Sequence, residues 1–254
     1  MLTLQSFQAL QKCCIIIPCF NEENRLPVAE IEAFISQNSH VQILGVNDGS
    51  RDRTLALLQT LERGHPGQFS TYDMPANSGK AEAVRAGMLH AITAFDAEYY
   101  GFWDADMSTP LSELVWFSEF SGGNLKYDII MGSRISRLGS NIDRKMMRHY
   151  LGRIFATFTS IILKLKVYDT QCGAKVFKKE IVSDLFSVPF KSKWFFDVEL
   201  LARYIKLHGH DKTYEQTLEV PLRRWIEVKG SKLKATDFLK VPLELIKIKR
   251  HYKL

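Results

Sequence analysis

The sequence predicts an open α/β fold in which a mostly parallel sheet is flanked by helices. Short apolar runs alternate with stretches of helical spacing between residues 13 and 134. A parallel strand is buried on both faces and therefore reads as an unbroken apolar run, whereas a surface helix repeats apolar residues every three or four positions. Strands and helices that alternate in this way are typical of parallel sheets.

Five apolar runs are predicted to form strands, at residues 13–18, 41–46, 69–72, 99–103 and 128–131. Between them, helices are predicted at residues 26–37 and 79–95. A further helix is predicted after Asp52, a residue that can cap the start of a helix. Beyond Arg134 the pattern predicts a helix at 144–166, a strand at 174–177, a helix at 194–207 and an edge strand at 220–225. A basic amphipathic stretch at 236–252 closes the chain.

The composition narrows the possible partners and compartments. A net charge of +6 over 254 residues favours an anionic partner, but no helix-turn-helix, zinc-finger or RNP-like pattern occurs, so no nucleic acid is expected. The four cysteines lack metal-ligand spacing and are expected to be buried, reduced thiols. The N-terminus has no basic signal-peptide start, and no apolar run approaches the ~20 residues of a membrane helix. We expect a cytoplasmic location, with at most peripheral contact to the cytoplasmic face of a membrane.

Polar turns follow four of the predicted elements, at residues 21–23, 48–50, 104–106 and 133–134. In open α/β sheets, ligands bind at the carboxyl ends of the strands. Because each of these turns follows an apolar run, we expect them to lie along one edge of the sheet and to form a site there.

Asp104 and Asp106 form an Asp-x-Asp sequence directly after the run at 99–103. Two carboxylates in one turn can hold Mg²⁺ or Mn²⁺, which would neutralise a leaving diphosphate. A lone Asp-x-Asp is more often a solvated turn, but its place at the end of a predicted strand favours a metal site. No basic side chain adjoins the two aspartates in the sequence, so a metal ion is their expected partner.

Two further turns carry candidate nucleoside and phosphate contacts. Asp48 either closes its Asp-Gly-Ser turn or accepts a hydrogen bond from a base or ribose. Lys80 can meet a phosphate at the start of its predicted helix, where free N–H groups also favour anions. No Gly-x-x-x-x-Gly-Lys or Gly-x-Gly-x-x-Gly sequence occurs, so P-loop and Rossmann dinucleotide sites are not expected.

Several short motifs occur in a fixed order: Ile-Pro-Cys-Phe-Asn-Glu-Glu (17–23), Asn-Asp-Gly-Ser-Arg-Asp (47–52), Asn-Ser-Gly-Lys (77–80), Asp-Ala-Asp (104–106) and Gly-Ser-Arg (132–134). Together they resemble the family 2 inverting glycosyltransferases, which have the GT-A fold. Three later segments, 169–177, 194–201 and 229–233, resemble the dolichyl-phosphate or polyprenyl-phosphate glucosyltransferase branch. The resemblance implies one catalytic domain over residues 1–233, followed by a C-terminal basic amphipathic segment over 234–254.

The resemblance implies a metal-dependent enzyme that moves a hexose, glucose in this branch, from a UDP-sugar to a polyprenyl or dolichyl phosphate. The implied catalytic residues are Asp104, Asp106, Arg134 and Asp197, and the implied ligands of Mg²⁺ or Mn²⁺ are Asp104 and Asp106. The implied nucleotide-sugar site contains Pro18, Phe20, Asn21, Glu22, Asp48, Gly49, Asn77, Lys80, Asp104, Ala105, Gln171 and Lys232. The acceptor phosphate is implied to meet Arg134, Arg144 and Arg148.

The chain departs from the family's pattern in three respects. Asn47 stands where the family often has aspartate, and Ser108 stands where the mannosyl relatives have a glutamine metal ligand. The C-terminal transmembrane pair of some relatives does not follow the motifs. Metal coordination and firm membrane anchoring are therefore the two implied properties that the departures affect.

The acceptor has two interpretations. Arg134, Arg137, Arg144, Arg148 and Arg153 cluster around one apolar helix and favour a lipid phosphate, although an ordinary core helix with a charged rim would look the same. A saccharide or other soluble hydroxyl acceptor would need a base, for which Asp197 is the best candidate. A non-catalytic nucleotide-sugar-binding protein is the remaining alternative, and the presence of both Asp104 and Asp106 argues against it.

The C-terminal segment also has two interpretations. Its apolar and basic residues could rest among anionic lipid headgroups, or its helix could dock on the protein's own core. The predicted helix at 144–166 offers a second membrane contact.

Overall fold

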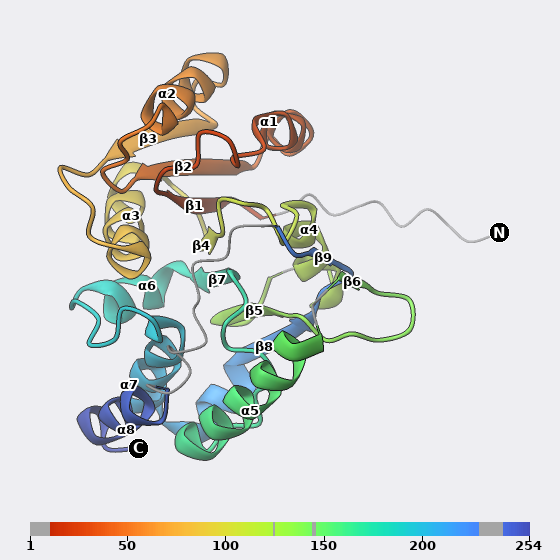
Figure 1. Ribbon diagram of the computed structural model, residues 1–254, viewed down its shortest axis with the longest axis vertical. Coiled ribbons are helices and arrows are strands. Elements are labelled where there is room, and N and C mark those ends of the chain that lie inside the picture. The colour runs from red at the N-terminus through yellow and green to blue at the C-terminus, as the bar shows by residue number, and fades with distance from the viewer. Residues whose placement is uncertain (1–10, 124, 144–145, 229–240) are drawn as a thin grey trace.

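The computed structural model describes residues 11–123, 125–143, 146–228 and 241–254. Figure 1 shows a central sheet with helices on both faces, which is the predicted open α/β architecture. The seven strands lie in the order β3-β2-β1-β4-β7-β5-β8. Their bounds are β1 Cys13–Cys19, β2 Val41–Asn47, β3 Phe69–Asp73, β4 Tyr99–Trp103, β5 Ile129–Ser133, β7 Ala174–Lys178 and β8 Thr217–Pro221.

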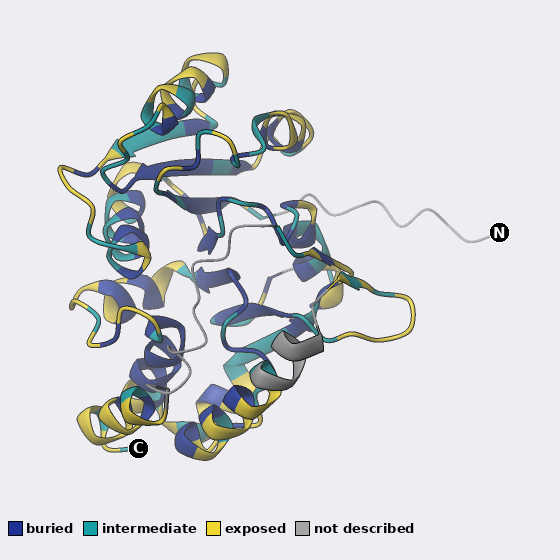
Figure 2. Ribbon diagram, in the orientation of Figure 1, coloured by how far each residue is buried: buried dark blue, intermediate teal, exposed yellow. Residues whose placement is uncertain are grey.

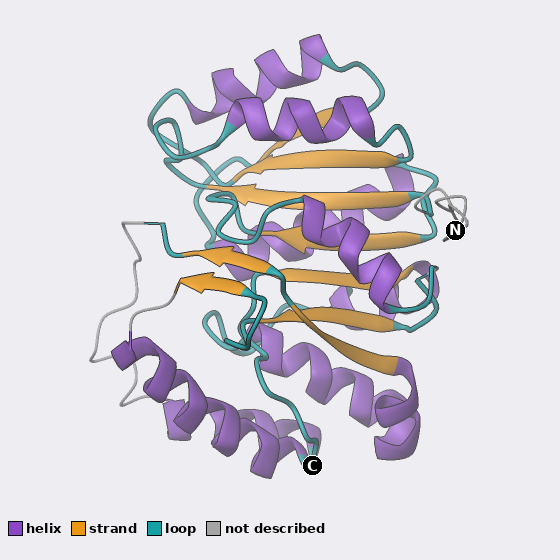
Figure 3. Cartoon of the chain, turned by 90° about the vertical axis from the view of Figure 1, so that its right-hand side faces the viewer, coloured by secondary structure: helices purple, strands orange, loops and turns teal. Residues whose placement is uncertain are grey.

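The sheet is parallel except at one strand. β3, β2, β1 and β4 run in the same direction, and β5 is parallel to β8. β7 lies between β4 and β5 and is antiparallel to both. Figure 3 shows these strands side by side with the helices around them. The mostly parallel sheet was predicted, but the reversed direction of β7 was not.

Two apolar clusters hold the helices to the two faces of the sheet. One cluster joins the sheet to α1 Val28–Gln37, α2 Thr54–Gly64 and α4 Ser112–Phe120. The other joins it to α3 Lys80–Ala94, α5 Met146–Leu163, α6 Lys179–Phe186, α7 Phe196–Gln216 and α8 Val241–Tyr252. In Figure 2 the edge strands β3 and β8 are mostly half-buried, whereas the strands between them are buried almost throughout. This burial on both faces explains why they read as unbroken apolar runs.

The predicted edge strand at 220–225 is wrong in its bounds. β8 is indeed the edge strand but ends at Pro221, and β9 Arg224–Ile226 pairs instead with β6 Asn141–Asp143 in a separate parallel ribbon. The chain bends between them because the buried carboxylate of Glu113 accepts hydrogen bonds from two successive backbone N–H groups, of Arg223 at 3.0 Å and of Arg224 at 3.2 Å. A bend held by a distant side chain leaves no local signal.

The C-terminal helix α8 docks on the protein's own core, which was one of the two interpretations of this segment. Leu245 and Ile248 are buried, and α8 lies against α5 and α7. The Tyr252 hydroxyl donates to Glu199 at 2.7 Å, and the Arg203 guanidinium donates to that hydroxyl at 3.1 Å.

All four cysteines are free and buried, as predicted. Burial raises the pKa of the Cys172 thiol to about 11, so this group stays protonated at neutral pH. Among the described residues, no helix is long and apolar enough to cross a membrane. The cytoplasmic location remains a prediction.

Candidate active site

The predicted site lies where the carboxyl ends of the parallel strands meet the beginning of β7. Because β7 runs in the opposite direction to β4, the loop at 169–173 that leads into β7 lies beside the turn that leaves β4. Trp103 pairs with Ala174, and the Asp104 N–H donates to the Gly173 carbonyl at 3.0 Å. The loop at 169–173 thereby joins the Asp-x-Asp turn, although the sequence separates the two by more than 60 residues.

Asp104 pairs with Lys80, the first residue of α3. The Lys80 ammonium also lies 5.9 Å from the ring centroids of Phe102 and Phe196. Burial alone would lower the pKa of Lys80, but the carboxylates of Asp104 and Asp197 outweigh it and raise that pKa above its ordinary value. Lys80 is therefore a fixed positive charge beside the Asp-x-Asp turn.

Asp106 pairs with Arg25, whose guanidinium donates to the carboxylate at 3.0 Å. Arg25 lies in the turn after β1 and is also 3.5 Å from Glu22. The expectation that a metal ion alone would partner the two aspartates is thus corrected, since Lys80 and Arg25 both reach them from distant turns. Arg25 was not predicted, although it lies only two residues beyond a polar turn that was.

Gly173 allows the Asp104 carboxylate to lie directly against the loop before β7. A Cβ atom on residue 173 would stand 1.9 Å from Asp104 Oδ2 and 2.2 Å from its Cγ. No side chain fits in that space unless Asp104 moves. The position of the Asp104 carboxylate therefore depends on the absence of a side chain at residue 173.

Asp48 holds the loop that carries Lys80. Its carboxylate accepts hydrogen bonds from the Asn77 amide at 2.9 Å and from the backbone N–H groups of Ser78 at 2.7 Å and Gly79 at 2.9 Å. Gly49 lies so close to this loop that a Cβ there would meet the Asn77 nitrogen at 2.5 Å. The hydrogen bond predicted from Asp48 to a nucleoside remains a prediction.

Pro18 lies within β1, and the turn after β1, with Phe20, Asn21 and Glu22, is tied to the turn after β2. The Asn21 N–H donates to the Ser50 hydroxyl at 3.0 Å, and the Asn21 side chain accepts from the Arg51 N–H at 2.9 Å. The Glu22 N–H donates to the Thr54 hydroxyl at 2.8 Å. These bonds bring the first two predicted nucleoside segments together at the same edge of the sheet.

Arg134, directly after β5, is bound by Asp169. Its Nε and one terminal nitrogen donate to the two carboxylate oxygens at 2.6 and 2.8 Å, and its own N–H donates at 3.1 Å. The guanidinium lies 5.5 Å from the ring centroid of Trp225 in β9. Burial would lower the pKa of Arg134, but Asp169 reverses the effect and raises it. Asp169 and Trp225, which the sequence did not assign, fix this cation in place.

Asp197, at the start of α7, forms a buried ion pair with Lys175 of β7. The Lys175 ammonium donates to the carboxylate at 2.5 Å and to the Cys172 carbonyl, and it lies 5.2 Å from the ring centroid of Phe102. Lys175 was not predicted, because a lysine within a strand usually points to solvent.

The remaining predicted residues divide into those the structure describes and those it does not. Ala105 is buried within the Asp-x-Asp turn. Gln171 lies in the loop before β7, and its amide nitrogen is buried without a hydrogen-bond partner among the described residues. Arg144 and Lys232 lie outside the described residues. Arg148 lies in α5, but its side chain is also outside the description.

A divalent metal fits the Asp-x-Asp turn as a shared site between protein and substrate. The side chains of Asp104 and Asp106 are 37% and 22% exposed, so both carboxylates remain accessible from solvent. In the described part of the chain, no three acidic, histidine or cysteine side chains gather as a complete metal cage. Mg²⁺ and Mn²⁺ commonly take one or two carboxylates and complete their coordination with phosphate oxygens and water.

Solved structures with the same architecture define the class of fold. The chain superimposes on mannosyl-3-phosphoglycerate synthase from Rubrobacter xylanophilus with a TM-score of 0.68 at 13% identity, covering 96% of this chain and 76% of that one. It also matches glucosyl-3-phosphoglycerate synthase from Mycobacterium tuberculosis, solved with Mn²⁺ and UDP, with a TM-score of 0.62 at 15% identity over 95% and 80% of the two chains. The fold is therefore the GT-A glycosyltransferase fold.

The chain belongs to glycosyl transferase family 2, whose family model matches residues 14–186. It is 32% identical to a dolichyl-phosphate beta-glucosyltransferase of Trichomonas vaginalis, over 94% of this chain and 73% of the relative. It is 30% identical to the dolichyl-phosphate beta-glucosyltransferase of Saccharomyces cerevisiae, over 94% and 75% of the two chains. The predicted family and fold are confirmed, and the protein is a glycosyltransferase.

Proposed function

We propose that this enzyme transfers glucose from UDP-glucose to a dolichyl or polyprenyl phosphate. The observation that carries the proposal is that Asp104, Asp106, Lys80 and Arg134 lie at one edge of a GT-A sheet. Relatives 30–32% identical over most of the chain are named dolichyl-phosphate beta-glucosyltransferases. UDP-glucose as the donor is supported by a solved structure of the same fold that holds this compound with Mn²⁺.

In this proposal Asp104 and Asp106 hold Mg²⁺ or Mn²⁺. When bound, the metal supplies positive charge that stabilises the leaving diphosphate. Lys80 and Arg25, which neutralise the two carboxylates here, are close enough to the same turn to contact diphosphate oxygens. Positive charge that is already fixed in place stabilises developing negative charge without reorganisation.

The donor's nucleoside and sugar are assigned to the turns along the same edge. The proposed contacts are Pro18, Phe20, Asn21, Glu22, Asp48, Gly49, Asn77, Ala105, Gln171 and Lys232. Hydrogen bonds join the turns after β1 and β2 and the loop before α3, so these segments present one continuous surface. Among the described residues of this set, Gln171 has a buried amide nitrogen without a hydrogen-bond partner, which can donate a hydrogen bond to the nucleotide-sugar.

The acceptor phosphate is assigned to Arg134, with Arg144 and Arg148 as further contacts. A phosphate monoester is already anionic at neutral pH, so the enzyme has to align it and offset charge repulsion, and no strong base is needed. The Asp197 carboxylate is held by buried Lys175. We therefore assign Asp197 to positioning the charges around Lys80 and Asp104, in place of the base that a hydroxyl acceptor would require.

The test is transfer from UDP-glucose labelled in the sugar to a short, water-soluble polyprenyl phosphate, with the corresponding polyprenol as the matched acceptor. We expect a labelled product from the phosphate alone, in the presence of Mn²⁺ or Mg²⁺ and not of a chelator. Asp106→Asn should abolish turnover while circular dichroism shows an intact fold. Equal transfer to the polyprenol would instead support a hydroxyl acceptor with Asp197 as the base.

A further inference from the structure

The outward face of α5 is apolar, which is unusual for a helix at the surface of a globular domain. Ile154, Phe158 and Ile161 follow one another at helical spacing, and these residues are 55%, 45% and 65% exposed. The inward face of the same helix is also apolar and buries Phe155 and Ile162. Apolar side chains on two opposite faces of a helix are ordinarily covered on both faces, by protein or by lipid.

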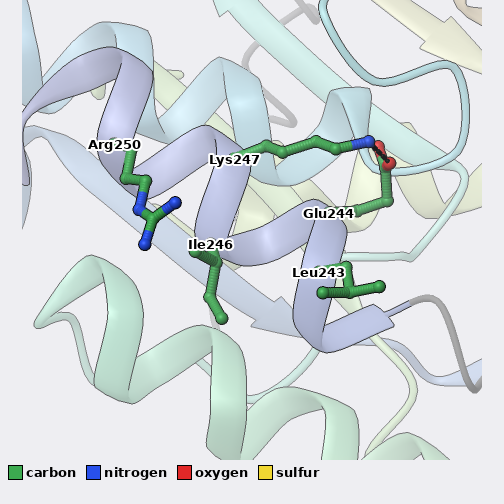
Figure 4. A pocket seen from close by; sticks show the side chains of 5 residues that line it. All are labelled: Leu243, Glu244, Ile246, Lys247 and Arg250. Carbon is green, nitrogen blue, oxygen red and sulfur yellow. Dashed lines mark hydrogen bonds and ion pairs between the residues drawn. The ribbon is translucent and has the colours of Figure 1, made fainter.

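The neighbouring helix α8 extends this apolar surface. Leu243 and Ile246 are 64% and 41% exposed, although Leu245 and Ile248 of the same helix are buried in the core. α5 and α8 contact each other. Figure 4 shows Leu243 and Ile246 on α8, where they line a surface hollow together with Glu244, Lys247 and Arg250.

The charged residues around these apolar side chains are almost all basic. Arg153, Lys164 and Lys166 are exposed on or just beyond α5, and Lys247, Lys249, Arg250 and Lys253 are exposed on or just beyond α8. The α5 sequence, residues 146–163, contains no acidic residue, and Glu244 of α8 is paired with Lys247 at 2.6 Å. Apolar side chains within a basic border complement a surface that is apolar inside and anionic outside.

We propose that the α5–α8 face, made of Ile154, Phe158, Ile161, Leu243 and Ile246, rests on an anionic lipid bilayer. The apolar side chains enter the boundary between headgroups and acyl chains, and the basic residues contact lipid phosphates. A second copy of this chain is a poorer occupant, because a symmetric dimer through this face would oppose two basic borders. None of these five side chains is assigned to the transfer site, so the proposal does not depend on the acceptor's identity.

The test is sedimentation of the full chain with vesicles of phosphatidylcholine containing phosphatidylglycerol, and with vesicles of phosphatidylcholine alone. The wild type should bind the anionic vesicles at low salt and lose affinity at high salt, because exposed charges are screened. Phe158→Glu should weaken binding by about tenfold or more, since it removes an apolar contact and adds a repelled charge. Phe120→Glu on α4 is the matched control, because Phe120 is 41% exposed on a different helix.

A second variant, Lys249→Glu with Arg250→Glu, tests the charges without touching the apolar row. It should lose the preference for anionic vesicles. Truncation of α8 is unsuitable, because Leu245, Ile248 and Tyr252 belong to the core contacts. Thermal melting and UDP-glucose turnover with the water-soluble acceptor should remain near wild type in both variants.

Three results would overturn the proposal. Phe158→Glu could bind anionic vesicles as tightly as the wild type, or the wild type could bind neither kind of vesicle at low salt. Alternatively, the wild type could be a dimer in solution that Phe158→Glu converts to a monomer, which would assign the face to a second copy. Loss of vesicle binding by Phe158→Glu with retained turnover supports the proposal. A wild-type enzyme that shows no turnover would contradict only the proposed function.

Discussion

Replacing Lys175 by methionine should destabilise the protein strongly and show that the buried ion pair organises the site. The Lys175 and Asp197 side chains are only 2% and 7% exposed. Methionine has a similar volume but no charge, so the Asp197 carboxylate would stay buried without its cation. Breaking a buried pair by removing one partner costs about 3–5 kcal/mol, because the other charge is left uncompensated.

The assay is thermal or urea unfolding followed by circular dichroism. For a domain of this size, a loss of this magnitude lowers the midpoint of thermal unfolding by about 6–20 °C. The double variant Lys175→Met, Asp197→Asn should recover much of the loss, because the orphaned charge is then absent. This recovery would show that the destabilisation comes from the broken ion pair and not only from the lost packing of the lysine side chain.

The reasoning is refuted if Lys175→Met alone unfolds within about 1 kcal/mol of the wild type, or if the double variant is no more stable than the single one. Either result would mean that water or another cation reaches Asp197. Lys175 would then be a surface-like lysine whose position in the strand is incidental.

Two further outcomes follow from the site. Gly173→Ala should lower turnover by about tenfold or more, because a methyl group 1.9 Å from Asp104 Oδ2 must displace that carboxylate. The control is Gly64→Ala, whose methyl group meets no atom within 4 Å and should leave turnover unchanged. The raised pKa of Lys80 means that its contribution to stability is fully present below its ordinary pKa of 10.5 and is lost as pH rises through the higher folded value. The stability difference between wild type and Lys80→Met should therefore stay constant from about pH 7 to 9 and shrink only above pH 10.5. An unchanged Gly173→Ala enzyme, or a difference that already shrinks near neutral pH, would contradict these assignments.

The sequence predicted the elements whose signal is local. All five residues of Tyr99–Trp103 are buried, which is why this segment is an apolar run that predicts a strand. The Asp-x-Asp sequence after it could therefore be placed at the edge of the sheet. Lys80 could be placed near the site because it begins α3 directly after a turn. The spacing of apolar residues and the residue types of turns act over a few positions, so a single sequence is enough to predict these elements.

The contacts that complete the site depend on distance in space and could not be predicted. Asp106 lies 81 residues from Arg25, and Asp197 lies 22 residues from Lys175. An apolar run also contains no information about the direction of its strand, so the reversal of β7 was missed. The helices α4 and α6 were missed as well, because each is short, at 9 and 8 residues, and lies between stronger signals.

Because β7 runs in the reversed direction, its register in the sheet determines where Lys175 and Gly173 lie relative to the carboxylates of the site. Its side chains alternate between the two faces of the sheet, with Ala174 and Val176 in one apolar cluster and Phe177 in the other. A shift by one residue would turn Lys175 away from Asp197 and carry Gly173 away from Asp104, because every side chain would change face. A single insertion or deletion at 169–173 should therefore disable both carboxylates at once. The same change in the exposed turn at 64–67, before β3, should be absorbed without reaching the site.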